Sequence, residues 1–379
     1  MVLAAIALIV SIVLPIYLSM MVQQQQQRLD SAIADLNSRV SKLEGQTPEA
    51  YLNNLYAAAK QEGALTFYHF YPTEWGQAML NAFQAKYPGI SLSQFTAPAG
   101  ELVTRISSEA TAGKYTADVI NMDAASHGVL KSMNLTAPYK ALGAQGGTFD
   151  PAFIDPDYNY YVVILEVMGG VVNTKLVPKE LWPIDWTDYI NPNPKLKGLV
   201  SFGDARRLGT QYIVLFSLIT KYGQEKTKTM YQSLTSINAK MWPTGSTGTD
   251  WVTTGEAPII FALPHTDYEG LRAAGVPVEF LSYASGLPAV AETMGIARNA
   301  PHPNAAKLFI EFYLSEEGQV ALTKEPLWFV PTRRGLVAQL PFLPPVSELL
   351  SKVIIIDYLA AANQRTDLRN LWGQWLGLA

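Results

Sequence analysis

The residues best suited to bind a small charged group stand in a short loop rich in hydroxyl side chains, Pro243–Thr249. The loop precedes a segment expected to be helical, so its N–H and O–H groups would be donors to an anion. Arg206 and Arg207 would add a guanidinium, which binds a carboxylate or phosphate through two hydrogen bonds. The same loop is typical of a capped turn, and the arginines of an ordinary surface. The donors of the loop are Thr244, Gly245, Ser246 and Thr247.

Three acidic residues favour the opposite kind of ligand. Glu74, Asp123 and Asp204 would attract a cation or an amine, or would pair with the two arginines. The residues alone therefore leave the sign of the ligand open.

Catalytic patterns are missing from the sequence. It holds no G-x-S-x-G, Walker A, H-E-x-x-H or G-x-G-x-x-G pattern, and its four histidines have no metal-ligand spacing. With no cysteine, disulfides, thiolate sites and a lipidated N-terminal cysteine are excluded. A net charge of -4 without a basic run argues against nucleic acid. We expect no enzyme, no cofactor and no resident metal.

Helical and strand patterns alternate from Thr47 onward, which is typical of parallel α/β layers. The expected helices are 47–61, 73–86 and 100–112, and the expected strands are 65–70, 90–95 and 119–122. Two long segments containing glycine, Tyr160–Asn173 and Ser285–Ala297, are interpreted as crossings between two lobes, with a second α/β block over Leu181–Phe280. The predicted divisions are lobe 1 over 47–167, lobe 2 over 168–286, and a return to lobe 1 with C-terminal helices over 287–379.

A different kind of segment begins the chain. Val2–Met21 carries no charged or amide side chain and is long enough to cross a membrane as a helix. No basic segment precedes it and no small-residue cleavage site follows, so residues 1–22 are predicted to be a retained transmembrane anchor. Apolar residues then recur at heptad spacing, which predicts a helical stalk over 23–46, as a spacer or as a coiled coil that forms an oligomer. The seam residues are Leu29, Ile33, Leu36, Val40 and Leu43.

A series of short phrases resembles the iron, thiamine, polyamine and phosphonate type of extracellular solute-binding protein, family 1. The resemblance extends over about 51–375. The phrases are Tyr56-Ala-Ala-Ala-Lys-Gln-Glu-Gly63, Ala82-Phe-Gln-Ala-Lys-Tyr-Pro-Gly-Ile90, Gly100-Glu-Leu-Val-Thr-Arg-Ile106 before Ala117-Asp-Val119, Trp186-Thr-Asp-Tyr189 with Lys197-Gly198, Gly203-Asp-Ala-Arg-Arg-Leu-Gly-Thr210, Gly255-Glu-Ala-Pro258, and the run from Pro303 to Gln319 with Val330-Pro-Thr332. Most of these phrases belong to the scaffold. Ala305, Leu308, Phe309 and Phe312, for example, have the spacing of a helix face that packs in a core.

The resemblance implies a type II periplasmic-binding-protein fold, in which two α/β lobes close on a solute and dock on an ABC permease driven by an ATPase. In such α/β folds ligands lie where strands end and helices begin. The candidate ligand-binding residues at such junctions are Tyr71, Thr73, Glu74, Gly100, Asp123, Arg206, Arg207, Thr210, Thr244, Gly245, Ser246, Thr247, His265 and Tyr268.

The identity of the solute is the most open part of this prediction. We favour a phosphonate, a sugar phosphate or a carboxylate; ferric iron, thiamine and polyamines are the alternatives within the family. Members that bind iron directly use two adjacent tyrosines beyond the phrase matching Gly255–Pro258 and a carboxylate matching Asp123. In this sequence His265 and Thr266 occupy the tyrosine positions and the nearest phenol is Tyr268, which argues against direct iron binding.

The expected function is that of a solute receptor for an ABC importer, held at the cell membrane with its body on the extracytoplasmic side. The alternative from another class is a membrane-tethered sensor or adhesion module that has kept the fold without transport, because a fold does not fix a function.

Overall fold

The structure is a computed structural model that describes residues 20–26, 28–29, 31–33 and 47–378. It divides into two compact units, 1–57 and 58–379, each considered by itself. In the first unit residues 20–26, 28–29 and 31–33 are helical, and Leu29 and Ile33 of the predicted seam are exposed. Most of the predicted anchor and stalk lies outside the described residues. Across the described ranges, every helix is too short or too polar to span a bilayer.

The second unit, here called the body, is built on one long mixed sheet. Its described strands number eleven, and the main path runs β2-β1-β3-β10-β5-β8-β6-β7, with β4 pairing β10 and with β9 and β11 pairing β5. The strands are β1 (Ala64–His69), β2 (Ser91–Thr96), β3 (Val119–Asp123), β4 (Thr136–Ala137), β5 (Tyr161–Asn173), β6 (Val200–Gly203), β7 (Lys240–Trp242), β8 (Ile259–Pro264), β9 (Val278–Leu281), β10 (Ala289–Ala297) and β11 (Val330–Pro331).

Strand β5 joins the two halves of the sheet. Its first part pairs antiparallel with β10, from Tyr161 opposite Met294 to Val167 opposite Ala289. Its second part pairs with β8 and β9. Its bounds coincide closely with the first predicted crossing, and β10 occupies most of the second. The boundaries of the two lobes stay a prediction.

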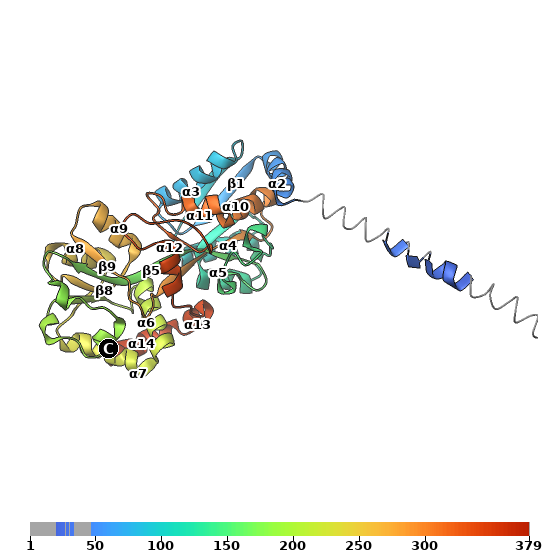
Figure 1. Ribbon diagram of the computed structural model, residues 1–379. Helices are drawn as coiled ribbons and strands as arrows, with labels where there is room; N and C mark the ends of the chain where they lie inside the picture. The colour runs from blue at the N-terminus through green and yellow to red at the C-terminus, as the bar shows by residue number, and fades with distance from the viewer. Residues whose placement is uncertain (1–19, 27, 30, 34–46, 379) are drawn as a thin grey trace, which may run out of the picture. The chain divides into compact units, whose positions relative to one another are not determined.

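The helices lie around this sheet (Figure 1). They are α3 (Thr73–Lys86), α4 (Ala99–Thr111), α5 (Ala124–Ser132), α6 (Gly209–Tyr222), α7 (Gln224–Ser236), α8 (Gly245–Thr254), α9 (His265–Ala273), α10 (Pro303–Leu314), α11 (Glu316–Ala321), α12 (Val346–Lys352), α13 (Tyr358–Asn363) and α14 (Arg365–Trp375), with short 3-10 turns at 142–144, 151–153, 179–181, 186–189 and 194–196. Helix α2 (Pro48–Glu62) contains residues of both units. In Figure 1, α3, α4 and α5 gather with β1 at one end of the body and α8 and α9 with β8 and β9 at the other. The predicted helix 73–86 and strand 119–122 are confirmed within one residue.

The apolar residues of the predicted helix face pack as expected. Ala305, Leu308, Phe309 and Phe312 of α10 are all buried. The Phe309 ring lies 5.2 Å from the ring of Phe67 on β1, between ring centroids. A pair of aromatic rings at this distance adds about 0.5–1.5 kcal/mol beyond burial of their area. The helix is therefore part of the scaffold, as its spacing predicts.

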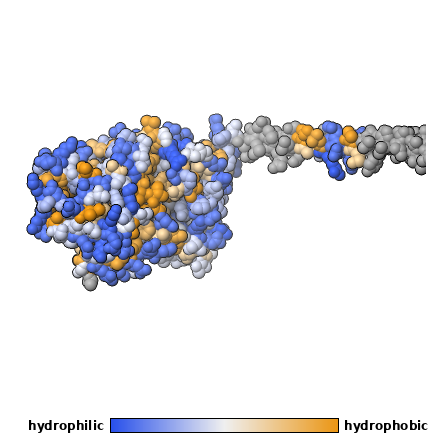
Figure 2. Space-filling model, turned by 60° about the horizontal axis from the view of Figure 1, so that its bottom comes forward, coloured by the Kyte–Doolittle hydropathy of each residue, from blue (hydrophilic) through white to orange (hydrophobic). Residues whose placement is uncertain are grey.

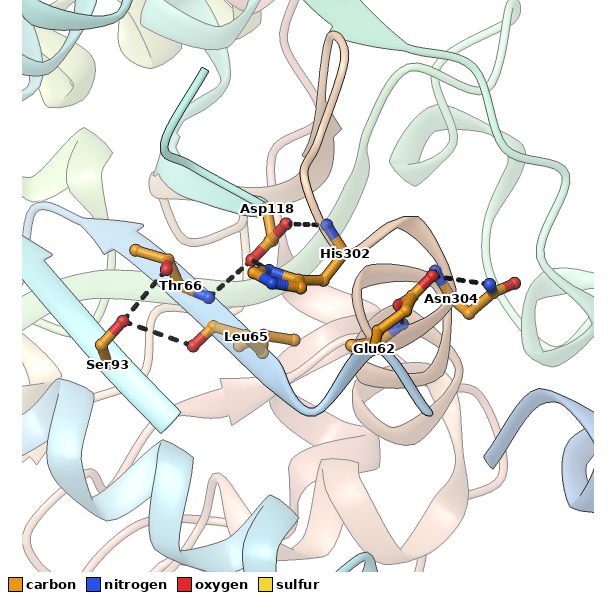
Figure 3. A network of polar contacts seen from close by, with 8 residues as sticks. Glu62, Leu65, Thr66, Ser93, Asp118, His302 and Asn304 are labelled. Atoms are coloured by element: carbon orange, nitrogen blue, oxygen red, sulfur yellow. Dashed lines mark hydrogen bonds and ion pairs between the residues drawn. The ribbon is translucent and has the colours of Figure 1, made fainter. Parts of the chain in front are cut away.

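A network of hydrogen bonds holds the starts of β1, β3 and α10 together (Figure 3). Asp118 is fully buried and accepts hydrogen bonds from Thr66 N at 2.7 Å, His302 N at 2.7 Å and His302 Nδ1 at 2.9 Å. Beside it, Glu62 accepts from Asn304 N at 3.0 Å and Ala305 N at 2.9 Å, two free donors in the first turn of α10. We call Glu62, Asp118, His302 and Asn304 the clasp.

The outer surface of the body is mixed. Figure 2 shows hydrophilic side chains over most of the visible face, with apolar patches between them. The large apolar residues that are exposed include Leu176, Ile184 and Val337. Most of the other large apolar side chains of the body lie in its core.

Candidate functional site

A partly open cavity of the body lies where the carboxyl ends of β1 and β3 meet the start of α6. Its volume is about 220 Å³, smaller than the roughly 300–1,000 Å³ of pockets for drug-sized ligands, so it suits a small solute. Its lining comes from β3, α5, β5, α6, β10, α13 and α14, together with Phe70, which follows β1. The lining residues are Phe70, Asp123, Ala125, Glu166, Gly209, Thr210, Ile213, Val290, Ala291, Glu292, Tyr358, Ala361, Ala362 and Arg365.

Glu292 of β10 is the most buried acid of the cavity, with only 4% of its surface exposed. Its Oε2 accepts a hydrogen bond from Tyr71 Oη, and Tyr71 Oη accepts in turn from Asn121 Nδ2 at 3.3 Å. Burial, together with the nearby charges of Glu166 and Asp123, raises the pKa of the Glu292 carboxyl well above its usual range. A buried carboxylate with so few donors is costly to ionise, unless a cation arrives.

Glu166 of β5 lines the cavity beside it. Its Oε1 accepts a hydrogen bond from Thr266 Oγ1 at 2.8 Å. Burial raises the pKa of Glu166 to about 7, and the charge of Asp267 adds to the shift. Since Glu166 in turn raises the pKa of Glu292, the two acids repel one another when both are ionised.

Asp123 is the third acid in the lining, and its environment differs. It is the last residue of β3 and caps α5, accepting from Ser126 N at 3.0 Å and from Ser126 Oγ at 2.6 Å. These donors satisfy part of its charge, so Asp123 also serves the scaffold.

The start of α6 and Arg365 also line the cavity. Gly209 and Thr210, the first two residues of α6, line the cavity, and the helix has no side-chain cap. Their N–H groups lie in the first turn, where a helix has no acceptors of its own, and this end of the helix favours negative charge.

Arg365 of α14 supplies the positive charge there. Its Cζ lies 5.7 Å from the centroid of the Tyr212 ring, and its buried Nε has no hydrogen-bond partner. Arg369 flanks the same ring at 5.4 Å, and both burial and the charge of Arg365 lower its pKa. Within residues 47–378, no ion pair joins Arg365 to a carboxylate. The guanidinium is therefore available to an anion in the cavity.

Three of the residues predicted from sequence lie at this cavity. Asp123 and Thr210 line it, and Tyr71 is buried against Glu292. His265 and Tyr268 of α9 are also buried, but they do not line the cavity. Both form hydrogen bonds with backbone carbonyls, His265 Nε2 with Trp328 O at 2.9 Å and Tyr268 Oη with Phe342 O at 3.1 Å.

The remaining predicted residues lie outside the lining. Thr73 and Glu74 are exposed in the first turn of α3, and Gly100 is exposed on α4. Arg206 forms two hydrogen bonds with Asp204, Nε to Oδ1 at 3.0 Å and Nη2 to Oδ2 at 2.9 Å. Arg207 is more exposed and lies 3.7 Å from Asp204. The arginines thus pair with an acid of their own loop, the alternative that the sequence left open.

The hydroxyl-rich loop is a helix cap in the structure. Thr244 caps α8, and its Oγ1 accepts from Thr247 N at 3.3 Å. Its hydroxyl also bonds with those of Ser246 at 3.0 Å and Thr247 at 2.8 Å, while Gly245 follows at the first helical position. These donors are used within the loop, so the interpretation as a capped turn describes them better than that as an anion site.

Sequence reasoning missed Glu166, Glu292, Tyr358 and Arg365. Glu166 and Glu292 were visible as single acids inside the otherwise apolar crossings, where a buried charge needs a reason. Arg365 gave no such signal, because only the fold brings a helix near the end of the chain to the cavity.

No group of three or more His, Asp or Glu side chains suited to a metal ion occurs in the part of the chain that the structure describes.

A mixed sheet whose two halves share a long strand, with a polar cavity at the strand ends, defines the class: a periplasmic-binding-protein fold. Residues 78–344 match the model of the family described as bacterial extracellular solute-binding protein, and the chain belongs to that family. This class serves ABC transporters outside the cytoplasm and is not enzymatic. Tyr358 and Arg365 lie beyond the matched residues.

Solved structures agree on the fold. Iron-bound HitA from Pseudomonas aeruginosa is similar at a TM-score of 0.67 and 21% identity, over 82% of this chain and 99% of that one. AfuA from Actinobacillus pleuropneumoniae, with fructose-6-phosphate bound, is similar at 0.63 and 24%, over 84% and 99%. An uncharacterised protein of Haemophilus influenzae is 28% identical over 223 residues, which cover 57% of this chain and 63% of that protein.

Proposed function

We propose that this protein is the solute receptor of an ABC importer and that its cavity captures a small solute with an acidic group, such as a phosphonate, a sugar phosphate or a carboxylate. One observation carries the proposal: Arg365, without a carboxylate partner among the described residues, faces the same cavity as the uncapped start of α6. An acidic group placed there would receive N–H donors and a guanidinium together. The fructose-6-phosphate in AfuA supports this choice of solute class.

The alternatives of the family receive less support. Members of the family that bind ferric iron directly use two adjacent tyrosines, and His265 and Thr266 stand at those positions in this chain. A polyamine would suit Glu166, Glu292 and Asp123 but would place a positive charge near Arg365. A solute with an acidic group avoids that repulsion.

Transport also requires attachment near a permease. We infer from the apolar run Val2–Met21 that the chain is held at the cell membrane by an N-terminal helix, with the body outside. Membrane fractionation of cells tests this inference. The full chain should sediment with membranes and resist extraction with carbonate, whereas a variant without residues 1–22 should not.

The first test of the receptor function is native mass spectrometry of the full chain, extracted gently in detergent. A retained small molecule bearing a phosphate, phosphonate or carboxylate would support the proposal and name the solute. Binding would then be checked by thermal shift, because a ligand of the native state raises the melting temperature by mass action. Melting points that respond to Fe(III) or spermidine and not to any acidic solute would contradict the acidic solute class.

A further inference from the structure

Groups of opposite charge line the cavity. Asp123, Glu166 and Glu292 come from β3, β5 and β10, whereas Arg365 comes from α14 and the free N–H groups come from the start of α6. All of them line one space of about 220 Å³. Yet no ion pair joins Arg365 to any of the three acids within the described residues, so the fold holds the two signs apart.

The acids lack hydrogen-bond donors, and Arg365 with the start of α6 lacks an acceptor. Glu292 has one phenol as a donor, and Glu166 has one hydroxyl. An ammonium carries three donors and a positive charge, which would satisfy free carboxylate oxygens and relieve the repulsion between the two acids. Arg365 and the first turn of α6 lack an acceptor with negative charge, which a carboxylate or phosphonate supplies.

Apolar side chains lie in the lining along with the acids and Arg365. Phe70, Ile213, Val290 and Tyr358 contribute to it. Such surfaces favour a short hydrocarbon spacer over a chain of hydroxyl groups, because burying an unpaired hydroxyl costs free energy.

We propose that the solute is zwitterionic, with an ammonium group held by Glu292 and Glu166, an acidic group held by Arg365 and the start of α6, and a short, mainly apolar spacer between them. This inference rests on the proposed function and assigns the solute class of the same cavity. It also explains why the cavity contains both acids and an arginine: the cation and the anion are two ends of one molecule. Glu292 and Arg365 are then the residues that determine specificity.

The test compares matched probes on the full chain in detergent, by isothermal titration at pH 7.5. The probes are aminoalkyl carboxylates and aminoalkyl phosphonates with spacers of one to five carbons. Each is matched with the same acid lacking the amine and with the same amine lacking the acid. We expect at least one zwitterion to bind about tenfold or more tightly than either matched probe, a difference of about 1.4 kcal/mol or more.

Variants then assign the two ends. Glu292→Gln keeps the shape of the side chain and should weaken the zwitterion about tenfold while leaving the matched acid unchanged; Glu166→Gln is the second variant for the same end. Arg365→Gln should weaken both the zwitterion and the acid. Glu269→Gln is the matched acid control, because Glu269 is buried with a pKa raised to about 7 but does not line the cavity. Arg369→Gln is the matched arginine control, because it flanks the same ring outside the lining. Both controls should bind within about twofold of the parent.

The outcomes separate the two proposals. If a matched acid binds as tightly as its zwitterion and Glu292→Gln changes nothing, the zwitterion is wrong and the receptor for acidic solutes stands. If no probe binds, the charges of the ligand retained in native mass spectrometry decide: a ligand with an ammonium supports the inference and a ligand without one overturns it. If no probe binds and no ligand is retained, the receptor function fails, and this inference fails with it.

Discussion

Two groups of acids lie at opposite ends of β3, and they differ in the hydrogen bonds that they accept: the clasp is at the start of the strand, and the cavity acids are at its carboxyl end. In the clasp, Asp118 accepts three hydrogen bonds and Glu62 accepts from two backbone N–H groups of α10 (Figure 3). In the cavity, Glu292 and Glu166 each accept one hydrogen bond, from a side chain. Backbone N–H groups thus donate to the two acids of the clasp, whereas Glu292 and Glu166 accept from side chains.

This difference distinguishes structural from functional acids. A buried carboxylate costs free energy unless donors surround it, so natural cores contain few that lack them. Where backbone N–H groups converge on an acid, the acid stabilises the fold. Where an acid faces open space with few donors, the missing partner is expected to come from outside the chain. The predictions below test this distinction, from the largest expected effect to the smallest.

The largest effect is expected in the clasp. Asp118→Ala would remove the buried acceptor of the Thr66 and His302 N–H groups and of the partly exposed His302 ring, at about 1–3 kcal/mol for each unmade bond to a buried group. We expect a loss of about 3 kcal/mol in the free energy of unfolding, measured with urea, and no change in the solute affinity of the folded protein. Glu317→Ala, which removes an exposed ion pair with Lys86, is the control and should cost under about 1 kcal/mol. Equal losses for both variants would contradict the role of the clasp.

In the cavity, the expected effect has the opposite sign. Glu166 has a folded-state pKa of about 7, above its unfolded value, so its protonated form stabilises the fold at low pH and this contribution is lost as pH rises from about 4.5 to 7. A glutamine at this position cannot ionise, so Glu166→Gln should not lose stability in this way as the pH rises. Without solute, the variant should be more stable than the parent by about 1–3 kcal/mol at pH 8, and the gain should vanish near pH 4.

The measurement is urea unfolding at pH 4 and pH 8 for the parent and the variant. In the parent, the affinity for an ammonium probe should rise over the same interval, since Glu166 must be ionised to attract it. The charged groups near Glu166 are Asp123, Glu292 and Asp267, along with Arg365 in the same lining. A Glu166→Gln variant less stable than the parent at pH 8 would show that Glu166 stabilises the fold, as the acids of the clasp do.

A smaller effect is expected at the phenol that supports Glu292. Tyr71→Phe removes the one donor to Glu292 and an acceptor for Asn121. Loss of a hydrogen bond to a buried acid costs about 1–2 kcal/mol, and solute affinity should fall severalfold because the carboxylate loses its orientation. Tyr313→Phe is a matched control, since that phenol bonds to a backbone carbonyl in the core. It should lose stability without losing affinity.

The smallest effect is expected at Arg206. This arginine pairs with Asp204 and donates from Nη1 to Leu378 O at 2.7 Å, outside the cavity lining. Arg206→Gln should cost about 1 kcal/mol or less and should leave the affinity for any acidic solute unchanged, as measured by titration. A tenfold loss of affinity would show that Arg206 takes part in binding the solute.

The sequence was informative about elements and less so about the site. Alternating patterns placed α3 and β3 to within a residue, and the junction after β3 identified Asp123. Local composition misled at Thr244–Thr247, because a loop rich in hydroxyl groups has the same sequence whether it binds an anion or caps a helix. Arg365 could not be found by local reasoning, since its place at the cavity depends on how the last helices return to the body.

The contact between Arg206 and Leu378 has a practical consequence. Helix α14 brings Arg365 to the cavity, and Arg206 donates a hydrogen bond to the carbonyl of Leu378, which follows α14. A purification tag fused close to Leu378 would compete with that contact and disturb the positioning of α14, and a receptor tagged there would be mistaken for one that binds nothing. Recombinant protein for ligand screening is better tagged at another site, and shortened versions should retain residues 358–378.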